Sequence, residues 1–467
     1  MTLIDNPPDV LVIGGGNAAL CAAISAAEGG ASVLLLEGAP EHFRGGNSRH
    51  TRDVRYMHTR VNSYVTGLYP EDEFWDDLIR VTGGKTNEQL ARLTIRASED
   101  LDEWMAEQGV KWQRPLRGTL HLARTNLFML GGGTGMMNGY YETAHRLGVT
   151  ILYDASVQDL AVDADGRFDH AVVTVNGQRR EIAARTVVTA AGGFEANIGW
   201  LKQYWGDAAD NFIIRGTPYN TGTVLSSLLE RGAQTNGDPR EFHAVAVDGR
   251  APTFDGGIVT RLDSVPFGIV VNREGQRFYD EGEDFWPKRY AIWGGLIARQ
   301  PGQEAYSIID SDVIDKFMPS VFHPVEAPTV GALATKMGLD ADTVTATVEQ
   351  FNRSIQPGGS FDPAELDDCK TDGLTPNKTH WAVPIKKPPF YGYPLRPGIT
   401  FTYMGVTVDE RARIIMHNGQ PSPNMTAAGE LMAGNVLGRG YLAGFGLTIG
   451  AVFGRIAGKE AAQSARR

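Results

Sequence analysis

The chain has 467 residues, 42% of them hydrophobic and 21% charged, and a formal net charge of −11. This composition is typical of a folded globular protein, and the acidic balance argues against a nucleic-acid-binding protein. The length exceeds that of one ordinary hydrophobic core, and no charged or Ser/Pro-rich linker divides the chain, so we expect two closely associated domains. A small anionic substrate would need a locally basic pocket in such an acidic protein.

Cysteine usage and the first residues predict a cytoplasmic protein. The two cysteines, Cys21 and Cys369, are too few for a disulfide framework or a cysteine metal site, so we expect no bound metal. The N-terminal segment lacks the basic stretch and long apolar run of a secretory signal. The uncharged stretch near the C-terminus, residues 440–454, is rich in glycine and too short to span a bilayer.

Residues 10–28 have the pattern of a strand, a glycine turn and a helix. The first four, V-L-V-I, form an apolar run typical of a buried parallel strand, and the last twelve are Ala-rich and favour a helix. The turn between them fits the pattern G-x-G-x-x-A, in which Gly14 allows a tight bend and Gly16 lets the backbone approach a pyrophosphate. The phosphates would lie at the helix N-terminus, beside Asn17 and Ala18.

A second predicted strand ends in an acidic residue. Residues 32–36 are apolar and are followed by Glu37 and Gly38. An acid about 20 residues after the first glycine can accept hydrogen bonds from a ribose and disfavours a 2′-phosphate. A glycine triplet alone is also common in ordinary loops, but two strands, a helix and a terminal acid together predict a dinucleotide. This pattern leaves FAD and NAD both open.

Small residues recur later in the chain, which favours FAD over NAD. Residues 44–52, R-G-G-N-S-R-H-T-R, carry a glycine pair followed by amide and hydroxyl groups, which suits a second backbone segment passing a ribityl chain. The apolar residues 186–190 run into A-G-G-F, and Met425 begins a similar run into A-A-G-E. The predicted cofactor contacts beyond the first turn and Glu37 are Gly45, Gly46, Asn47, Ser48, Val157, Ala191, Gly192, Gly193, Gly222, Gly429, Glu430, Gly446 and Leu447.

Together these motifs resemble those of the fumarate reductase/succinate dehydrogenase flavoprotein superfamily, over essentially the whole chain. Within it, residues 278–289, F-Y-D-E-G-E-D-F-W-P-K-R, and residues 432–441, M-A-G-N-V-L-G-R-G-Y, are most similar to the FAD-dependent tricarballylate dehydrogenase family. The resemblance implies an α/β fold, with a Rossmann-like FAD-binding domain, an inserted α+β capping domain and the flavin ring at their junction. We expect the FAD-binding domain at 1–237 and 400–467, and the capping domain at 238–399.

Three segments define the expected inserted domain. Residues 267–278 predict a hairpin with a turn at Glu274-Gly275, and residues 341–355 predict a helix with one apolar face. The proline-rich residues 386–398 are interpreted as a linker back to the first domain. A mobile cap over the flavin would exclude water from a hydride transfer.

Two residues of the expected cap are candidates for substrate chemistry. The resemblance implies that His243 binds substrate and that Arg289 is the arginine credited with proton transfer. The pKa of an arginine is very high, so the side chain rarely gives up a proton. A bidentate contact with a carboxylate is therefore the better-founded role for Arg289. His243 would otherwise be a satisfied structural histidine, and Arg289 would otherwise pair with Glu283 or Asp284. About four extra residues precede Arg289, so Lys288 competes with it.

Three further candidates mark departures from the superfamily pattern. Thr400 stands in the segment where superfamily fumarate reductases have a histidine. Tyr441 stands where they have a second carboxylate-binding arginine, and Arg439 precedes it by two residues. We therefore expect a bulkier polycarboxylate, such as tricarballylate oxidised to cis-aconitate, in place of fumarate. The glycine-rich start of the helix expected after Tyr441 would stabilise a reduced flavin anion. The resemblance also concerns covalent attachment, because in succinate dehydrogenases a histidine before the glycine pair carries the flavin. His50 follows the glycine pair, so we expect noncovalent FAD.

Three alternatives stay open. Residues 130–135, L-G-G-G-T-G, could hold a second dinucleotide and make the protein an NAD(P)H-linked flavoprotein reductase. Tyr403 and Tyr441 would suit a ketone substrate, as in the related 3-ketosteroid dehydrogenases. The third alternative is a noncatalytic flavin-binding module.

Electrons from the reduced flavin need an acceptor. The sequence has no iron–sulfur cysteine pattern or haem-binding motif, so we expect them to leave to another molecule. The resemblance implies a separate iron–sulfur or membrane protein as the electron-transfer partner and, through it, peripheral association with a membrane. The expected small-molecule partner is a carboxylic acid.

Overall fold

The computed structural model describes residues 7–115 and 121–466. These residues group into two compact units. The first unit comprises Met1–Trp200, Gly216–Phe242 and Thr400–Arg467, and the second comprises Leu201–Arg215 and His243–Ile399. The second unit thus includes a short segment that precedes the expected insertion, and its main part begins at His243. The domain boundaries expected from the sequence concern domains that fold independently. They therefore remain a prediction.

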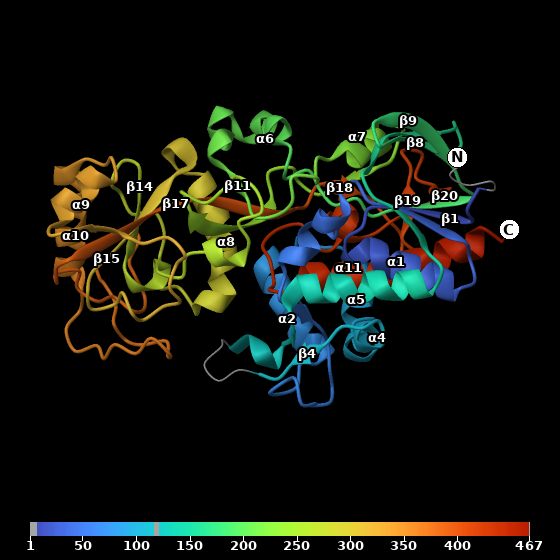
Figure 1. The fold of residues 1–467 in the computed structure, drawn as a ribbon. Helices are drawn as coiled ribbons and strands as arrows, with labels where there is room; N and C mark the ends of the chain where they lie inside the picture. The colour runs from blue at the N-terminus through green and yellow to red at the C-terminus, as the bar shows by residue number, and fades with distance from the viewer. Residues whose placement is uncertain (1–6, 116–120, 467) are drawn as a thin grey trace. The chain divides into compact units, whose positions relative to one another are not determined.

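The first unit is built on a six-stranded sheet with the order β19-β20-β10-β1-β2-β6 (Figure 1). All neighbouring pairs are parallel except β19 with β20. The strands β1, β2 and β10 are buried along their whole length, which explains their unbroken apolar runs. The strands are β1 (Val10–Ile13), β2 (Val33–Leu36), β6 (Thr150–Leu152), β10 (Thr186–Thr189), β19 (Arg413–Ile415) and β20 (Pro421–Ala427).

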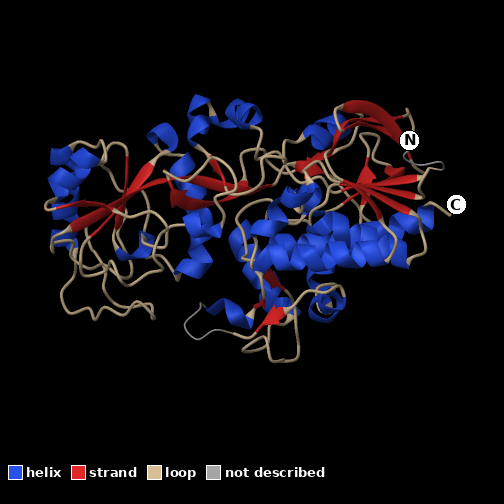
Figure 2. Ribbon diagram, viewed as in Figure 1, coloured by secondary structure: helices blue, strands red, loops and turns tan. Residues whose placement is uncertain are grey.

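Three helices lie side by side along one face of this sheet: α1 (Asn17–Glu28), α5 (Gly132–Arg146) and α11 (Phe445–Ser464) (Figures 1 and 2). Small residues let α1 and α11 approach closely, because a Cβ atom on Gly458 would collide with the backbone of Ala22. An antiparallel sheet lies on the other side, formed by β7 (Ala155–Val162), β8 (Phe168–Val175) and β9 (Gln178–Ala183). The expected helices at 17–28 and in the C-terminal region are therefore present.

The other elements of the first unit are short. They are β3 (Asp53–Arg55), β4 (Trp112–Gln113) and β5 (Asn126–Met129), which form one antiparallel sheet, β12 (Thr235–Asn236) paired with β18 (Gly405–Val406), and the helices α2 (Glu71–Thr82), α3 (Glu88–Arg96), α4 (Leu101–Glu107) and α7 (Thr223–Glu230). Helix α6 (Ile198–Trp205) begins in the first unit and ends in the second.

Besides the end of α6, the described part of the second unit combines one mixed sheet with three helices. Its core contains apolar side chains of β14, β15, α9 and α10, including Ile269, Ile308, Leu333 and Phe351. The strands are β11 (Ile213–Ile214), β13 (Phe242–Asp248), β14 (Ile269–Asn272), β15 (Ala305–Ile309), β16 (Val325–Ala327) and β17 (Phe390–Thr402), and the helices are α8 (Trp286–Ala298), α9 (Val330–Lys336) and α10 (Ala341–Ser354). The expected fold class, a Rossmann-like unit with an additional α+β part, is confirmed.

The prediction of a linker at residues 386–398 was wrong. Most of this segment belongs to β17, a 13-residue strand that pairs with β11, β13, β15 and β16. Its prolines lack an N–H group but keep a carbonyl group, and the Pro394 carbonyl accepts a hydrogen bond from the Gly249 N–H at 2.8 Å. Proline content therefore indicated a linker where the chain forms the longest strand among the described residues.

The helix and the turn expected in the second unit are both present. Helix α10 begins at Ala341 as expected, with Val344, Val348 and Phe351 buried. The expected turn is present as well, since Gly275 has a φ of +74° and its N–H donates to the Asn272 carbonyl. The hairpin itself is minimal, because the returning chain makes a single bridge and β14 takes β15 as its main partner.

Among the described residues, no helix combines the length and the apolar composition that a membrane span requires.

Candidate functional site

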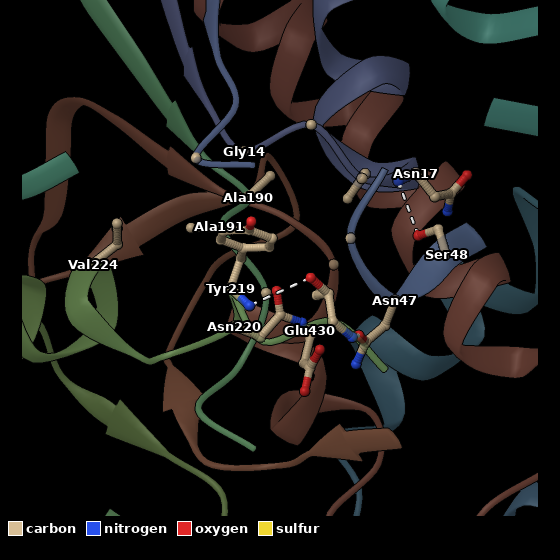
Figure 3. A pocket seen from close by; sticks show the side chains of 18 of the residues that line it. Gly14, Asn17, Asn47, Ser48, Ala190, Ala191, Tyr219, Asn220, Val224 and Glu430 are labelled. Carbon is tan, nitrogen blue, oxygen red and sulfur yellow. Dashed lines mark hydrogen bonds between the residues drawn. The ribbon is translucent and has the colours of Figure 1, made fainter. Parts of the chain in front are cut away.

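A cavity opens where the parallel strands of the first unit end. The register places Ile13 beside both Leu36 and Thr189, and Thr189 beside Ala427. The segments that follow these strands therefore meet at one edge of the sheet, the usual ligand position in such folds. About 1270 Å³ of space, partly open to solvent, lies between them (Figure 3).

The first wall of the cavity is the glycine turn after β1. Gly14 has a φ of +114°, and a Cβ atom there would collide with the Ala190 carbonyl. This close approach brings the turn against the end of β10. The Asn17 N–H at the start of α1 donates to Ser48 Oγ at 3.0 Å (Figure 3). The first turn of a helix leaves further N–H groups without intrahelical acceptors, which suits a diphosphate.

Glu37 lies at the end of β2 and lines the cavity. Its carboxylate accepts hydrogen bonds from the Ala39 N–H at 2.9 Å and the Gly45 N–H at 3.3 Å. Burial raises the pKa of this carboxyl, and the hydrogen bonds partly oppose the increase. Gly45 itself does not line the cavity, so its observed contact is with Glu37.

Asn47 joins three segments of the cavity wall. Its Nδ2 donates to Glu195 Oε1 at 2.5 Å and to the Thr400 carbonyl at 2.8 Å. Its Oδ1 accepts a hydrogen bond from the Thr217 N–H at 2.8 Å. Asn47, Thr217 and Thr400 all line the cavity. The asparagine that follows the glycine pair is therefore held in one orientation.

The start of α11 forms another part of the wall. Gly444 precedes the helix with a φ of +78°, and Gly446 and Leu447 in the first turn line the cavity. The Gly446 N–H donates to the Tyr441 hydroxyl at 3.2 Å. The Leu447 carbonyl accepts from Asn17 Nδ2 at 2.9 Å, which ties the starts of α11 and α1 together.

These features fit FAD. A helix N-terminus at the glycine turn is suited to a diphosphate, Glu37 is placed for a ribose, and backbone of small residues from four segments allows close approach of an extended molecule. The second glycine-rich segment has a different role. It follows β5, a strand of an antiparallel sheet, and a Cβ atom on Gly133 would collide with the Ser48 carbonyl. The antiparallel sheet before this segment and the packing of Gly133 against Ser48 both disfavour a second dinucleotide turn at residues 130–135.

A sequence model of the FAD binding domain family matches residues 9–447. The chain belongs to this FAD-binding family. It is similar to an NADH:fumarate oxidoreductase of Klebsiella pneumoniae (strain 342), with 27% identity over 469 residues. The match covers 98% of this chain but only 48% of that relative, so the chain spans about half its length. The expected fumarate reductase/succinate dehydrogenase flavoprotein superfamily is confirmed.

Solved structures show the same fold. A flavocytochrome c3 fumarate reductase in an open conformation has a TM-score of 0.78 and 22% identity, over 99% of this chain and 79% of that one. The 3-ketosteroid delta1-dehydrogenase of Sterolibacterium denitrificans has a TM-score of 0.76 and 21% identity, over 98% of this chain and 99% of that one.

Most of the predicted cofactor contacts lie around this one cavity. Gly45 and Gly193 do not line it. Gly193 instead lets Thr402 and Glu430 pack closely, because a Cβ atom there would collide with both side chains. The predicted residues that line the cavity are Gly14, Gly16, Asn17, Ala18, Glu37, Gly38, Gly46, Asn47, Ser48, Val157, Ala191, Gly192, Gly222, Gly429, Glu430, Gly446 and Leu447.

The five catalytic candidates are distributed over both units. Thr400 and Tyr441 line the cavity of the first unit. Arg439 is exposed and does not line it. His243 and Arg289 belong to the second unit. The side chain of Lys288, the competing cation, lies outside the described residues.

His243 is buried at the start of β13, with 3% of its surface exposed. Its ring meets the Tyr290 ring edge to face at 6.2 Å between centroids. Burial, with the positive charge of Arg215, lowers the pKa of His243 well below its usual value. The imidazole is therefore neutral near pH 7. It is suited to hydrogen bonding and not to binding a carboxylate as a cation.

Arg289 forms an ion pair with Glu283, one of the two partners that the sequence suggested for a structural role. Its Nη2 donates to Glu283 and to the Tyr279 hydroxyl, the latter at 3.0 Å. The Nε of Arg289 is buried and finds no hydrogen-bond partner among the described residues. One side of the guanidinium is thus held by the protein, and the buried Nε–H is available to another acceptor.

Sequence reasoning missed several residues of the cavity. Tyr219 and Asn220 line it, as do hydroxyl side chains such as Thr217. Glu195, completely buried, bonds Asn47 and Asn220. It directly follows the A-A-G-G-F string, so an acid adjoining a recognised cofactor motif was the available signal. The segment with Asn220 showed no such signal beyond Gly222.

Proposed function

We propose that the protein is an FAD-dependent oxidoreductase that forms or reduces a carbon–carbon double bond next to a carboxylate. The proposed substrate is a polycarboxylate, with oxidation of tricarballylate to cis-aconitate as the specific reaction. The observation that supports this most is that Thr400 and Tyr441 line the same cavity as the FAD-binding glycines. The names of the curated relatives support the reaction class, since the Klebsiella protein is a fumarate oxidoreductase.

Four residues have proposed roles toward the substrate. When bound, FAD supplies the group that accepts or donates hydride. Arg289 binds a substrate carboxylate through its unpartnered Nε, a charge-assisted contact. Neutral His243 donates a hydrogen bond to a second carboxylate. In the first unit, the hydroxyls of Thr400 and Tyr441 are the proposed hydrogen-bonding groups for a substrate. We do not assign a substrate contact to exposed Arg439.

The binding mode of FAD and the electron acceptor belong to the same proposal. His50 does not line the cavity, which supports noncovalent FAD. A separate electron-transfer protein would accept the electrons, and its membrane association would place this protein at a membrane surface. Acid precipitation tests the first point: a free yellow supernatant is expected, and colour that stays in the pellet would show a covalent bond.

An anaerobic flavin-reduction screen tests the substrate. The purified holoprotein is mixed with tricarballylate, citrate, succinate and a 3-ketosteroid, and the visible absorbance of the flavin is followed. Tricarballylate should bleach the flavin fastest. Bleaching by the steroid alone would reverse the proposal. The buried Tyr403 argues against that outcome, because its hydroxyl donates to the Gly440 carbonyl within the protein.

A pyridine-nucleotide-linked reductase is the second candidate. It is favoured by the name of the Klebsiella relative, of which this chain covers about half. The packing of Gly133 and the antiparallel sheet before residues 130–135 disfavour direct NADH binding at that segment. Addition of NADH to the same anaerobic holoprotein distinguishes the two, since rapid bleaching would favour the reductase.

A further inference from the structure

Two buried glutamates meet in the first unit. Glu195 follows β10 and is completely buried, and Glu430 follows β20 and is 8% exposed. The two carboxyl groups are within hydrogen-bonding contact of each other. Two carboxylates in this position would repel one another strongly, because little water is present to screen them.

The hydrogen bonds around the pair show how it is satisfied. Glu195 Oε1 accepts from Asn47 Nδ2 at 2.5 Å and from Asn220 Nδ2 at 2.6 Å. Glu430 Oε1 accepts from the Thr402 N–H at 2.7 Å and the Thr402 hydroxyl at 3.0 Å. Glu195 Oε2 is buried and receives no donor from an N–H or hydroxyl group.

Charge compensation by a cation is not available to this pair. Among the described residues, neither carboxyl has a lysine or arginine as an ion-pair or hydrogen-bond partner. A proton on one of the carboxyls would remove the repulsion and would give Glu195 Oε2 its donor. The arrangement is that of two carboxyl groups that hold one proton.

We propose that Glu195 and Glu430 share one proton, with the Glu430 hydroxyl donating to Glu195 Oε2, and that this bond orients Asn47 and Glu430 toward FAD. Glu195 is then a positioning residue. It does not line the cavity, but Asn47, Asn220 and Glu430 all do. These three side chains come from separate segments, after β2, before α7 and after β20. Figure 3 shows Asn47, Asn220 and Glu430 around the cavity, and we infer that the bonded carboxyl pair connects these three parts of the cofactor site.

The electrostatic surroundings agree with this assignment. Burial and the negative charge of Glu195 raise the pKa of Glu430 well above its usual value, and burial also raises the pKa of Glu195. Tyr403 lies near Glu430, whose charge acts on the tyrosine hydroxyl. Burial, followed by the charges of Tyr441, Glu241 and Glu430, raises the pKa of Tyr403 well above its usual value. Tyr403 is therefore neutral at pH 7 and adds no charge to the pair.

The proposed shared proton acts on FAD binding, which the family establishes. It does not depend on the identity of the substrate. Failure of the substrate screen would therefore leave it intact. A raised pKa means that the stabilising proton is fully present below the usual pKa of glutamate and is lost as pH rises through the raised pKa of Glu430. FAD should consequently dissociate faster from the holoprotein at high pH.

The experiment measures FAD release by the rise of flavin fluorescence, as a function of pH, in the wild-type holoprotein and in Glu430→Gln and Glu195→Gln. We expect the wild-type release rate to rise roughly tenfold or more on loss of the proton, as for a lost charge-assisted hydrogen bond. In Glu430→Gln an amide N–H replaces the shared proton permanently, so the rise should disappear. Glu195→Gln should remove it as well, because its amide can donate to a Glu430 carboxylate.

Glu460→Gln is the matched control. Glu460 is a buried carboxyl of the same unit but is paired with Arg411 at 2.6 Å. This variant should keep the wild-type pH dependence. A wild-type rate that does not change with pH, or a rise that persists in both pair variants, would overturn the proposal.

Infrared spectroscopy provides a readout that does not depend on FAD release. A protonated carboxyl has a C=O stretching band that a carboxylate lacks. At neutral pH this band should be weaker in Glu430→Gln than in the wild type, and unchanged in Glu460→Gln. Equal bands in the wild type and Glu430→Gln would also overturn the proposal.

Discussion

Burial gives the two candidates of the second unit, His243 and Arg289, different chemistry. His243 is surrounded so that its pKa falls and the ring stays neutral. Arg289 stays charged and is anchored on one side by Glu283 and Tyr279. A carboxylate substrate would therefore meet one cation and one neutral donor, whereas the sequence alone left both residues open to purely structural roles.

Arg289→Met should lower kcat/KM for the proposed polycarboxylate by roughly 10- to 100-fold, mainly through KM. The reason is the loss of one charge-assisted hydrogen bond worth about 1.5–3 kcal/mol. Arg299→Met is the control, because Arg299 ends the same helix and donates to the Gly295 carbonyl at 2.7 Å. Steady-state kinetics of both variants decide the role, and equal losses in the two would point to helix stability instead.

His243 should affect stability at acid pH. Its folded-state pKa is lowered, so the neutral imidazole contributes stability that is present above the unfolded pKa of about 6.5 and is lost as pH falls through the folded value. The free energy of unfolding in urea should therefore fall more steeply between pH 7 and 4 in the wild type than in His243→Gln. Parallel pH curves for the two proteins would contradict the assignment.

Small residues determine how α1 and α11 pack in the first unit. Both helices contribute their N-terminal turns to the cavity through Asn17 and Leu447, so their separation sets the geometry of the cofactor site. Two glycines of α11 that face α1, Gly454 and Gly458, have no room for a side chain because backbone atoms of α1 lie too close. Helix packing and cofactor binding are thus coupled at the level of these two elements.

Gly458→Ala should destabilise the protein by about 1–3 kcal/mol, because overpacking against a backbone forces the helices apart. Gly199→Ala in α6 is the matched control. Gly199 is exposed and a Cβ atom there has only an ordinary contact, so better helix propensity should stabilise by up to about 1 kcal/mol. Denaturant unfolding measures both effects, and stabilisation by both substitutions would show that α1 and α11 have room to spare.

At the scale of the whole molecule, the cofactor joins distant parts of the first unit. The cavity is lined by residues from the glycine turn after β1 to the start of α11, near opposite ends of the chain. Bound FAD therefore contacts only the folded arrangement, and a ligand that binds only the folded state stabilises it by mass action.

FAD at 100 times its Kd should raise the free energy of unfolding of the FAD-depleted protein by about 2.7 kcal/mol. Riboflavin at the same concentration should stabilise much less, since it lacks the diphosphate that suits the α1 N-terminus. Thermal unfolding with each ligand measures the difference. Equal stabilisation by FAD and riboflavin would contradict a diphosphate site at the α1 N-terminus.

The amino-acid sequence by itself determined the local signals of this protein. The strand, turn and helix of residues 10–28, the acid after β2 and helix α10 depend on apolar periodicity and glycine placement within short windows, so they could be predicted. Only the tertiary structure decided which distant segments meet. The proline-rich residues of β17 form a strand because four other strands pair with them. Glu195 and Glu430 gain their significance from a contact across more than half of the chain, because a hydrogen bond between two buried carboxyls leaves no periodic pattern in either local sequence.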